Sequence, residues 1–105
     1  MKISAAIAYT PDQSFSIESF YLEEPRNDEV LVRIVASGIC HTDIAVKEQD
    51  VELPLPMILG HEGAGVVEKV GADVSHLRVG DHVVLSGDSC GLCRKCQQGL
   101  PSYCD

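Results

Sequence analysis

The chain has 105 residues, of which 45% are hydrophobic and 23% are charged, a balance typical of a folded domain rather than a disordered segment. Sixteen acidic against eight basic side chains give a formal net charge of -8, which disfavours a nucleic acid or an anionic membrane as partner. No apolar run is long enough to span a bilayer, and the first residues lack the apolar core of a signal peptide. We therefore expect a cytoplasmic protein with no membrane partner.

The first third of the sequence predicts three strands separated by turns. The segment "KISAAIAY" (2–9) is short and apolar, and a turn leads to "SFSIESFYL" (14–22), in which apolar and polar residues alternate. The alternation changes phase between Ile17 and Phe20, which predicts a β-bulge there. The third segment, "VLVRIVASG" (30–38), is apolar at nearly every position, as expected of a strand covered on both faces.

A short helix is predicted after the third strand. Gly38 ends that strand, and "HTDIAVKEQ" (41–49) is the best helix candidate, with Thr42 or Asp43 able to cap its first turn. Cys40 would then lie just before the helix N-terminus, where partial positive charge favours a thiolate.

Two more strands follow the helix. Pro54 and Pro56 favour extended backbone, and both "GAGVVEKVG" (63–71) and "DHVVLS" (81–86) have the composition of strands. With little helix elsewhere, the sequence predicts a mainly β fold, which would be a small barrel or a partly closed sheet.

Four of the five cysteines form the run C-x2-C-x2-C-x7-C near the end of the chain: Cys90, Cys93, Cys96 and Cys104. Gly91 and Gly99 permit tight turns between them. Four thiolates at this spacing can surround one ion tetrahedrally, and zinc is the commonest occupant of an all-cysteine site. The odd number of cysteines and the expected reducing compartment favour metal ligation over a disulfide framework.

Other interpretations of the four thiols are open but less favoured. The compact iron–sulfur run has about three residues before its last cysteine and then a proline, whereas this chain has seven and then Asp105. A redox dithiol is a poor fit, because the cysteine pairs overlap and a fourth cysteine lies nearby. Four free core cysteines are the least favoured interpretation.

The fifth cysteine, Cys40, has His61 and Glu62 as candidate neighbours, but the familiar short motifs do not fit. "HEGAG" has Gly65 where a zinc protease needs a second histidine, and "GAGVVE" has Glu68 in place of the third glycine of a dinucleotide loop. By themselves, Cys40 and His61 fit a metal site and a core cysteine beside a surface histidine about equally well.

The motifs "GICHTD", "PMILGHEGAGVV", "VGDHVV" and "CGLCRKC…C" occur in an order and at spacings that resemble the zinc-containing medium-chain alcohol dehydrogenases. The resemblance covers essentially the whole chain, and its details look most like the aryl-alcohol (benzyl-alcohol) branch. It implies a GroES-like, partly closed barrel with a short helix and a zinc-binding loop lobe at about 88–105. It also implies that residues 1–105 are the N-terminal part of the catalytic domain, without the family's Rossmann domain.

The resemblance further implies a catalytic zinc. Cys40 and His61 would be two of its protein ligands, with Glu62 beside the metal as an occasional ligand or a neighbour of the ligands. Asp43 would hydrogen-bond the His61 ring nitrogen that faces away from the zinc. The third ligand of the family, a later cysteine, is missing from these residues.

The remaining roles follow from the same resemblance. Thr42 would pass on the proton of the substrate hydroxyl, and His41 would lie near the pyrophosphate of the cofactor. A second, structural zinc would be held by the four-cysteine run: Cys90, Cys93, Cys96 and Cys104.

The activity implied for the whole protein is the oxidation of primary alcohols, in this branch aryl alcohols, to aldehydes with NAD or NADP, with zinc as a Lewis acid. The whole protein would act on a small-molecule alcohol or aldehyde and form a homo-oligomer. We expect residues 1–105 alone to be inactive because they lack a dinucleotide-binding turn. A stand-alone zinc-stabilised GroES-like binding or assembly module is the alternative, although it would have no use for a second, open metal site.

Overall fold

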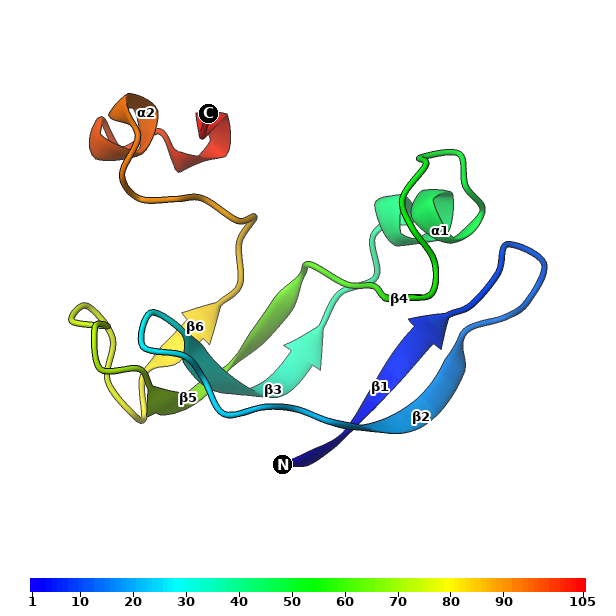
Figure 1. Ribbon diagram of the computed structural model, residues 1–105, viewed down its shortest axis with the longest axis horizontal. Helices are drawn as coiled ribbons and strands as arrows, with labels where there is room; N and C mark the ends of the chain where they lie inside the picture. Colours follow the sequence, from blue (N-terminus) through cyan, green and yellow to red (C-terminus); the bar gives the residue numbers. More distant parts are fainter.

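Two three-stranded antiparallel sheets carry the fold of the computed structural model, which describes residues 1–105 (Figure 1). The first sheet has the strand order β2-β1-β4 and is formed by β1 (Lys2–Ala8), β2 (Ser16–Tyr21) and β4 (Met57–Ile58). The second has the order β3-β5-β6 and is formed by β3 (Val30–Ser37), β5 (Gly63–Val70) and β6 (His82–Val84). The predicted mainly β architecture is confirmed, and the barrel is only partly closed because no strand pairing joins the two sheets.

The pairing of β1 with β2 is regular, because residues 2–7 pair in order with residues 21–16 without a shift. The β-bulge predicted between Ile17 and Phe20 is therefore wrong. The phase change reflects exposure instead: Ile17 lies on the open face with 72% of its surface accessible, whereas Phe20 is half-buried on the other face.

The prediction that both faces of β3 are covered is also wrong for these residues, since Ile34 and Val35 are 48% and 62% exposed. β3 is an edge strand, and β5 is the one element that packs extensively against it. The apolar composition identified surface that can be buried, but residues 1–105 supply no layer to cover it.

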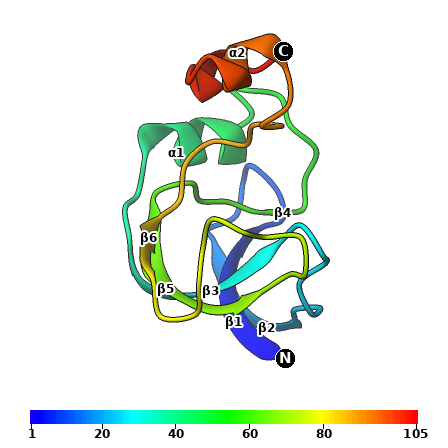
Figure 2. The same cartoon turned by 90° about the vertical axis from the view of Figure 1, so that its left-hand side faces the viewer.

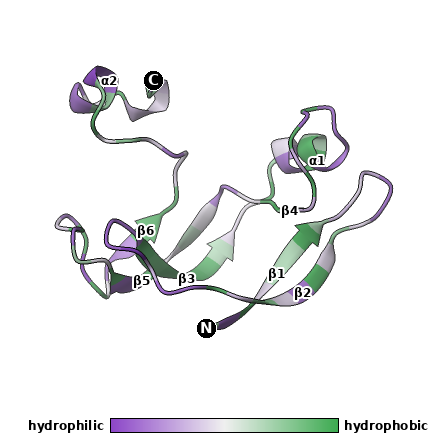
Figure 3. Cartoon of the chain, in the orientation of Figure 1, coloured by the Kyte–Doolittle hydropathy of each residue, from purple (hydrophilic) through white to green (hydrophobic).

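The core is small, with 7 of 105 residues buried. Figure 3 shows that hydrophobic residues are concentrated in β1, β3, β6 and α1 (His41–Lys47). The buried apolar side chains come from β1, α1 and β5: Ile7, Ala8, Val46 and Val67. Lys47 ties the helix to the turn between β1 and β2, since its Nζ donates to the carbonyl of Pro11 at 2.9 Å.

Helix α1 begins where the sequence predicts, but its N-cap is Cys40 rather than Thr42 or Asp43. Asp43 is the third residue of the helix, and its Oδ2 accepts the backbone N–H of Cys40 at 3.1 Å. An acidic side chain in the first turn also suits the positive end of the helix dipole. Asp43 therefore caps the first turn as one of the two predicted candidates, but it does so from the third helical position of a capping box and not from the N-cap.

The C-terminal lobe consists of α2 (Arg94–Gln97) and the 3-10 helix η1 (Pro101–Tyr103). It lies apart from the strands, and Figures 1 and 2 show the lobe and α1 on the same side of the two sheets. Neither helix has the length and apolar character that crossing a membrane requires.

Candidate metal centres

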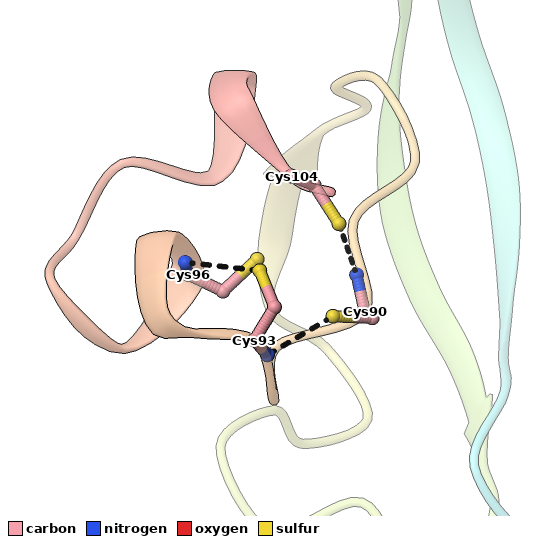
Figure 4. A group of neighbouring side chains, drawn as sticks. All are labelled: Cys90, Cys93, Cys96 and Cys104. Atoms are coloured by element: carbon pink, nitrogen blue, oxygen red, sulfur yellow. Dashed lines mark hydrogen bonds between the residues drawn. The ribbon is translucent and has the colours of Figure 1, made fainter.

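Four sulfur atoms converge in the C-terminal lobe, all within 4.8 Å of one another (Figure 4). We call this group the four-cysteine cluster: Cys90, Cys93, Cys96 and Cys104. A tetrahedral zinc–sulfur site with bonds of about 2.3 Å has sulfur atoms roughly 3.8 Å apart. The donor set and its spacing therefore fit zinc with little rearrangement.

Backbone N–H groups hold the sulfurs of the four-cysteine cluster in place. Cys90 Sγ accepts from Cys93 N–H at 3.2 Å, and Cys93 Sγ accepts from Cys96 N–H at 3.5 Å (Figure 4). Gly91 and Gly99 have φ values of 69° and 77°, so the predicted tight turns use backbone conformations that glycine adopts readily. Because N–H donors stabilise negative charge on sulfur, the local backbone favours thiolates before any metal binds.

The thiols of this cluster differ in acidity. Hydrogen bonds from the Asp105 and Cys96 backbones lower the pKa of Cys93 to about 6. Partial burial, together with a hydrogen bond to Cys93, raises the pKa of Cys96 to about 12. The free cluster therefore keeps a proton on Cys96 near neutral pH, and a metal ion has to displace that proton.

A second group lies where α1 meets the start of β5. Cys40, His61 and Glu62 each offer one ligand atom, and these atoms lie within 4.8 Å of one another. We call this group the Cys40 cluster. Cys40 follows β3, whereas His61 and Glu62 directly precede β5, so the β3–β5 pairing brings Cys40 close to residues that lie more than twenty positions further along the chain.

Asp43 connects the two halves of the Cys40 cluster. Its Oδ1 lies 3.1 Å from His61 Nδ1, and its Oδ2 accepts the Cys40 N–H. Only 8% of Asp43 is exposed, whereas 46% of the His61 side chain is accessible, so the pair is shielded from water on the Asp43 side alone. A carboxylate accepts hydrogen bonds, so Asp43 favours a proton on His61 Nδ1 and leaves Nε2 as the ring nitrogen that faces Cys40.

The neighbours of Cys40 and His61 shift both pKa values. A hydrogen bond with Thr42 is the main cause of the lowered Cys40 pKa, and the two groups are 3.5 Å apart. The pKa of His61 is raised, chiefly by its hydrogen bond to Cys40 and then by the charge of Asp43. The thiolate that a metal needs is thus favoured, while the imidazole loses its proton less readily.

Two other predicted site residues, Thr42 and His41, differ in how close they lie to the Cys40 cluster. Thr42 touches the Cys40 sulfur, whereas His41, the first residue of α1, is exposed and makes no side-chain hydrogen bond. Motif matching missed a role for Gly38, whose N–H donates to the Glu62 carbonyl at 2.9 Å beside the cluster. The only signal in the sequence was its position at the strand end, two residues before Cys40.

The chain belongs to the alcohol dehydrogenase GroES-like domain family, whose model matches residues 26–105. The GroES-like fold expected from the four motifs is thereby confirmed. With a four-sulfur cluster that can close around an ion and a three-donor cluster that cannot, the domain has two chemically different candidate metal sites.

Three known proteins show in more detail what this chain is similar to. The chain is 42% identical over 106 residues to an NDMA-dependent alcohol dehydrogenase of Amycolatopsis methanolica, covering 100% of this chain and 29% of the relative. It is 45% identical over 100 residues to a geraniol dehydrogenase of Castellaniella defragrans, covering 95% and 26%. It superposes on the crystal structure of benzyl alcohol dehydrogenase from Acinetobacter calcoaceticus with a TM-score of 0.94 and 46% identity, over 100% and 29% of the two chains. The chain spans less than a third of the length of each relative.

Proposed function

We propose that residues 1–105 are the N-terminal part of the catalytic domain of a zinc-dependent alcohol dehydrogenase. The whole protein would oxidise primary alcohols, aryl alcohols among them, to aldehydes with NAD or NADP. The observation that carries the proposal is the Cys40 cluster, in which sulfur, imidazole and carboxylate donors converge beside an Asp–His pair. A binding module stabilised by the four-cysteine cluster would need no such second site.

The Cys40 cluster has the donors of an open zinc site. Zinc bound there supplies a Lewis acid that lowers the pKa of an alcohol oxygen. Cys40 contributes a thiolate that Thr42 stabilises, and Asp43 turns the His61 Nε2 lone pair toward the cluster. Cys40 and His61 would fill two of four positions, with Glu62 as an occasional ligand. We place the third protein ligand outside these residues, which leaves the fourth position for a substrate oxygen.

Two side chains of α1 have proposed roles next to the cluster. The Thr42 hydroxyl, already within reach of Cys40 Sγ, would accept the proton of the alcohol and pass it toward solvent. His41 is exposed at the helix start, where it would approach the pyrophosphate of the cofactor. The nicotinamide-binding domain, a homo-oligomeric assembly and a cytoplasmic location belong to the same proposal for the whole protein.

The four-cysteine cluster has the donors of a closed, structural zinc site. Four sulfur ligands leave no open position, so a metal there serves folding rather than turnover. Zinc would hold together a lobe that has two very short helices and no buried side chain. Residues 88–105 would thus form a loop lobe that zinc stabilises.

The test is alcohol-dependent reduction of NAD or NADP, followed by nicotinamide absorbance, in the full-length protein that contains this chain. Benzyl alcohol and other primary alcohols should be oxidised. His61→Ala should abolish turnover, whereas Thr42→Ala should slow it by about 100-fold or more while zinc stays bound. His76→Ala, an exposed histidine in a loop, is the matched control and should leave activity unchanged. A full-length protein that binds zinc and turns over no alcohol or aldehyde would favour the binding module.

A further inference from the structure

Gly38 lies opposite Glu62 at the end of the β3–β5 ladder. The last pair of that ladder is Ser37 with Gly63, and the Gly38 N–H then donates to the Glu62 carbonyl at 2.9 Å. Residues directly opposite each other in an antiparallel pair send their side chains to the same face, with Cβ atoms about 5 Å apart. A side chain at position 38 would therefore compete with Glu62 for space.

The space beside Gly38 is already filled by Glu62. A Cβ atom added to Gly38 would overlap Glu62 Oε2, and it would lie 3.2 Å from Glu62 Cβ and 3.3 Å from Cδ. The backbone of Gly38 does not have a positive φ, so alanine fits its conformation without strain. The effect of a substitution would thus fall on the Glu62 side chain and not on the Gly38 backbone.

We infer that Gly38 is a positioning residue for the Cys40 cluster: its missing side chain keeps the Glu62 carboxylate within reach of Cys40 and His61. This inference rests on the proposed metal site at that cluster. Alanine at position 38 would turn the carboxylate away and leave two donors in place of three. Metal affinity would fall although none of the three donor residues had been changed.

The test is a double-mutant cycle on the 105-residue chain, with the four-cysteine cluster first loaded with one equivalent of zinc. Co²⁺ is then titrated, and its absorption band from the Cys40 thiolate is followed. Glu62→Ala should weaken Co²⁺ binding by about tenfold or more, and Gly38→Ala should do the same. Adding Gly38→Ala to Glu62→Ala should change the affinity by less than about twofold, since the clash no longer exists.

Controls separate a positioning role from a general loss of structure. Gly87→Ala should be silent in the titration, because an added Cβ there meets nothing within 4 Å and the φ is not positive. If Gly38→Ala weakens Co²⁺ binding equally with and without Glu62, or has no effect, the inference is overturned.

Other outcomes of the titration would show that the proposed metal site itself is wrong, whatever the role of Gly38. If the unmodified chain shows no thiolate–cobalt band, or if Cys40→Ser keeps the band, the proposed site is wrong. A crystal structure of Gly38→Ala then decides the role of Gly38 without any metal. The Glu62 carboxylate should lie outside the 4.8 Å reach of Cys40 and His61 that it has here, and a carboxylate that stays in place would overturn the inference.

Discussion

Replacing Asp43 with asparagine should shift His61 away from the tautomer that can bind a metal. The substitution keeps the shape of the side chain but turns one acceptor oxygen into an NH₂ donor. In the structure both carboxylate oxygens are used, one by the Cys40 N–H and one by His61 Nδ1, each at 3.1 Å. Asparagine has one acceptor oxygen, so it can serve only one of these two donors.

The two donors differ in how they can respond. The Cys40 N–H is a fixed donor, so it should take the amide oxygen and preserve the start of α1. His61 can move its proton to Nε2 and accept from the NH₂ through Nδ1, which removes the Nε2 lone pair from the cluster. Metal affinity should then fall about 10–100-fold, or roughly 1.4–2.8 kcal/mol. Stability should fall by only about 1 kcal/mol, since both hydrogen bonds survive in weaker, uncharged form.

Two measurements check this prediction. Nitrogen NMR of the His61 imidazole reports the tautomer, and Co²⁺ titration of the zinc-loaded chain reports affinity. Asp50→Asn is the matched control, because Asp50 is exposed and makes no side-chain hydrogen bond. If Asp43→Asn retains both the Nδ1–H tautomer and the Co²⁺ affinity, Asp43 does not set the orientation of the ligand atom.

Three further predictions concern the four-cysteine cluster and the sheet. Cys93→Ser should lower the zinc content from about one per chain to near zero and lower the melting temperature, as elemental analysis and thermal unfolding would show. Between about pH 6 and pH 9, chelator competition should show zinc affinity rising at least tenfold per pH unit, because Cys93 is ionised above a pKa of about 6 while Cys96, with a pKa of about 12, still has a proton to lose. Constant affinity across that range would contradict those protonation states. Gly65→Ala should destabilise the fold by about 1–3 kcal/mol in urea unfolding, since its Cβ would overlap the Arg33 carbonyl oxygen and lie 2.7 Å from Val32 Cγ1, whereas Gly87→Ala should change little.

The local features of the chain could be predicted from sequence because their causes are local. The four-cysteine run needs only the turns at Gly91 and Gly99 to bring its sulfurs together, and both turns have the expected positive φ. The strands and helix α1 likewise follow from apolar patterns and turn residues. Even here the cap of α1 was misplaced, because cysteine at the N-cap gives no signal of its own.

Features that depend on distant residues could not be derived in this way. Whether Cys40 meets His61 depends on the register of β3 against β5, which includes two shifts that no local pattern in the chain signals. That Cys40 and His61 lie close together was expected from the resemblance to a family and not from their spacing in the sequence. The exposure of Ile34 and Val35 was mispredicted for a related reason: an apolar side chain shows what can be buried, and only the packed structure shows what is.

The metal content of the purified 105-residue chain tests most directly the claim that it holds one closed and one open metal site. After dialysis against a mild chelator, elemental analysis should find about one zinc per chain, and X-ray absorption should show only zinc–sulfur distances of about 2.3 Å. The second zinc should be lost, because the Cys40 cluster offers three donors and cannot close around the ion. No retained zinc, two retained zinc ions, or iron in place of zinc would contradict the assignment of the two clusters.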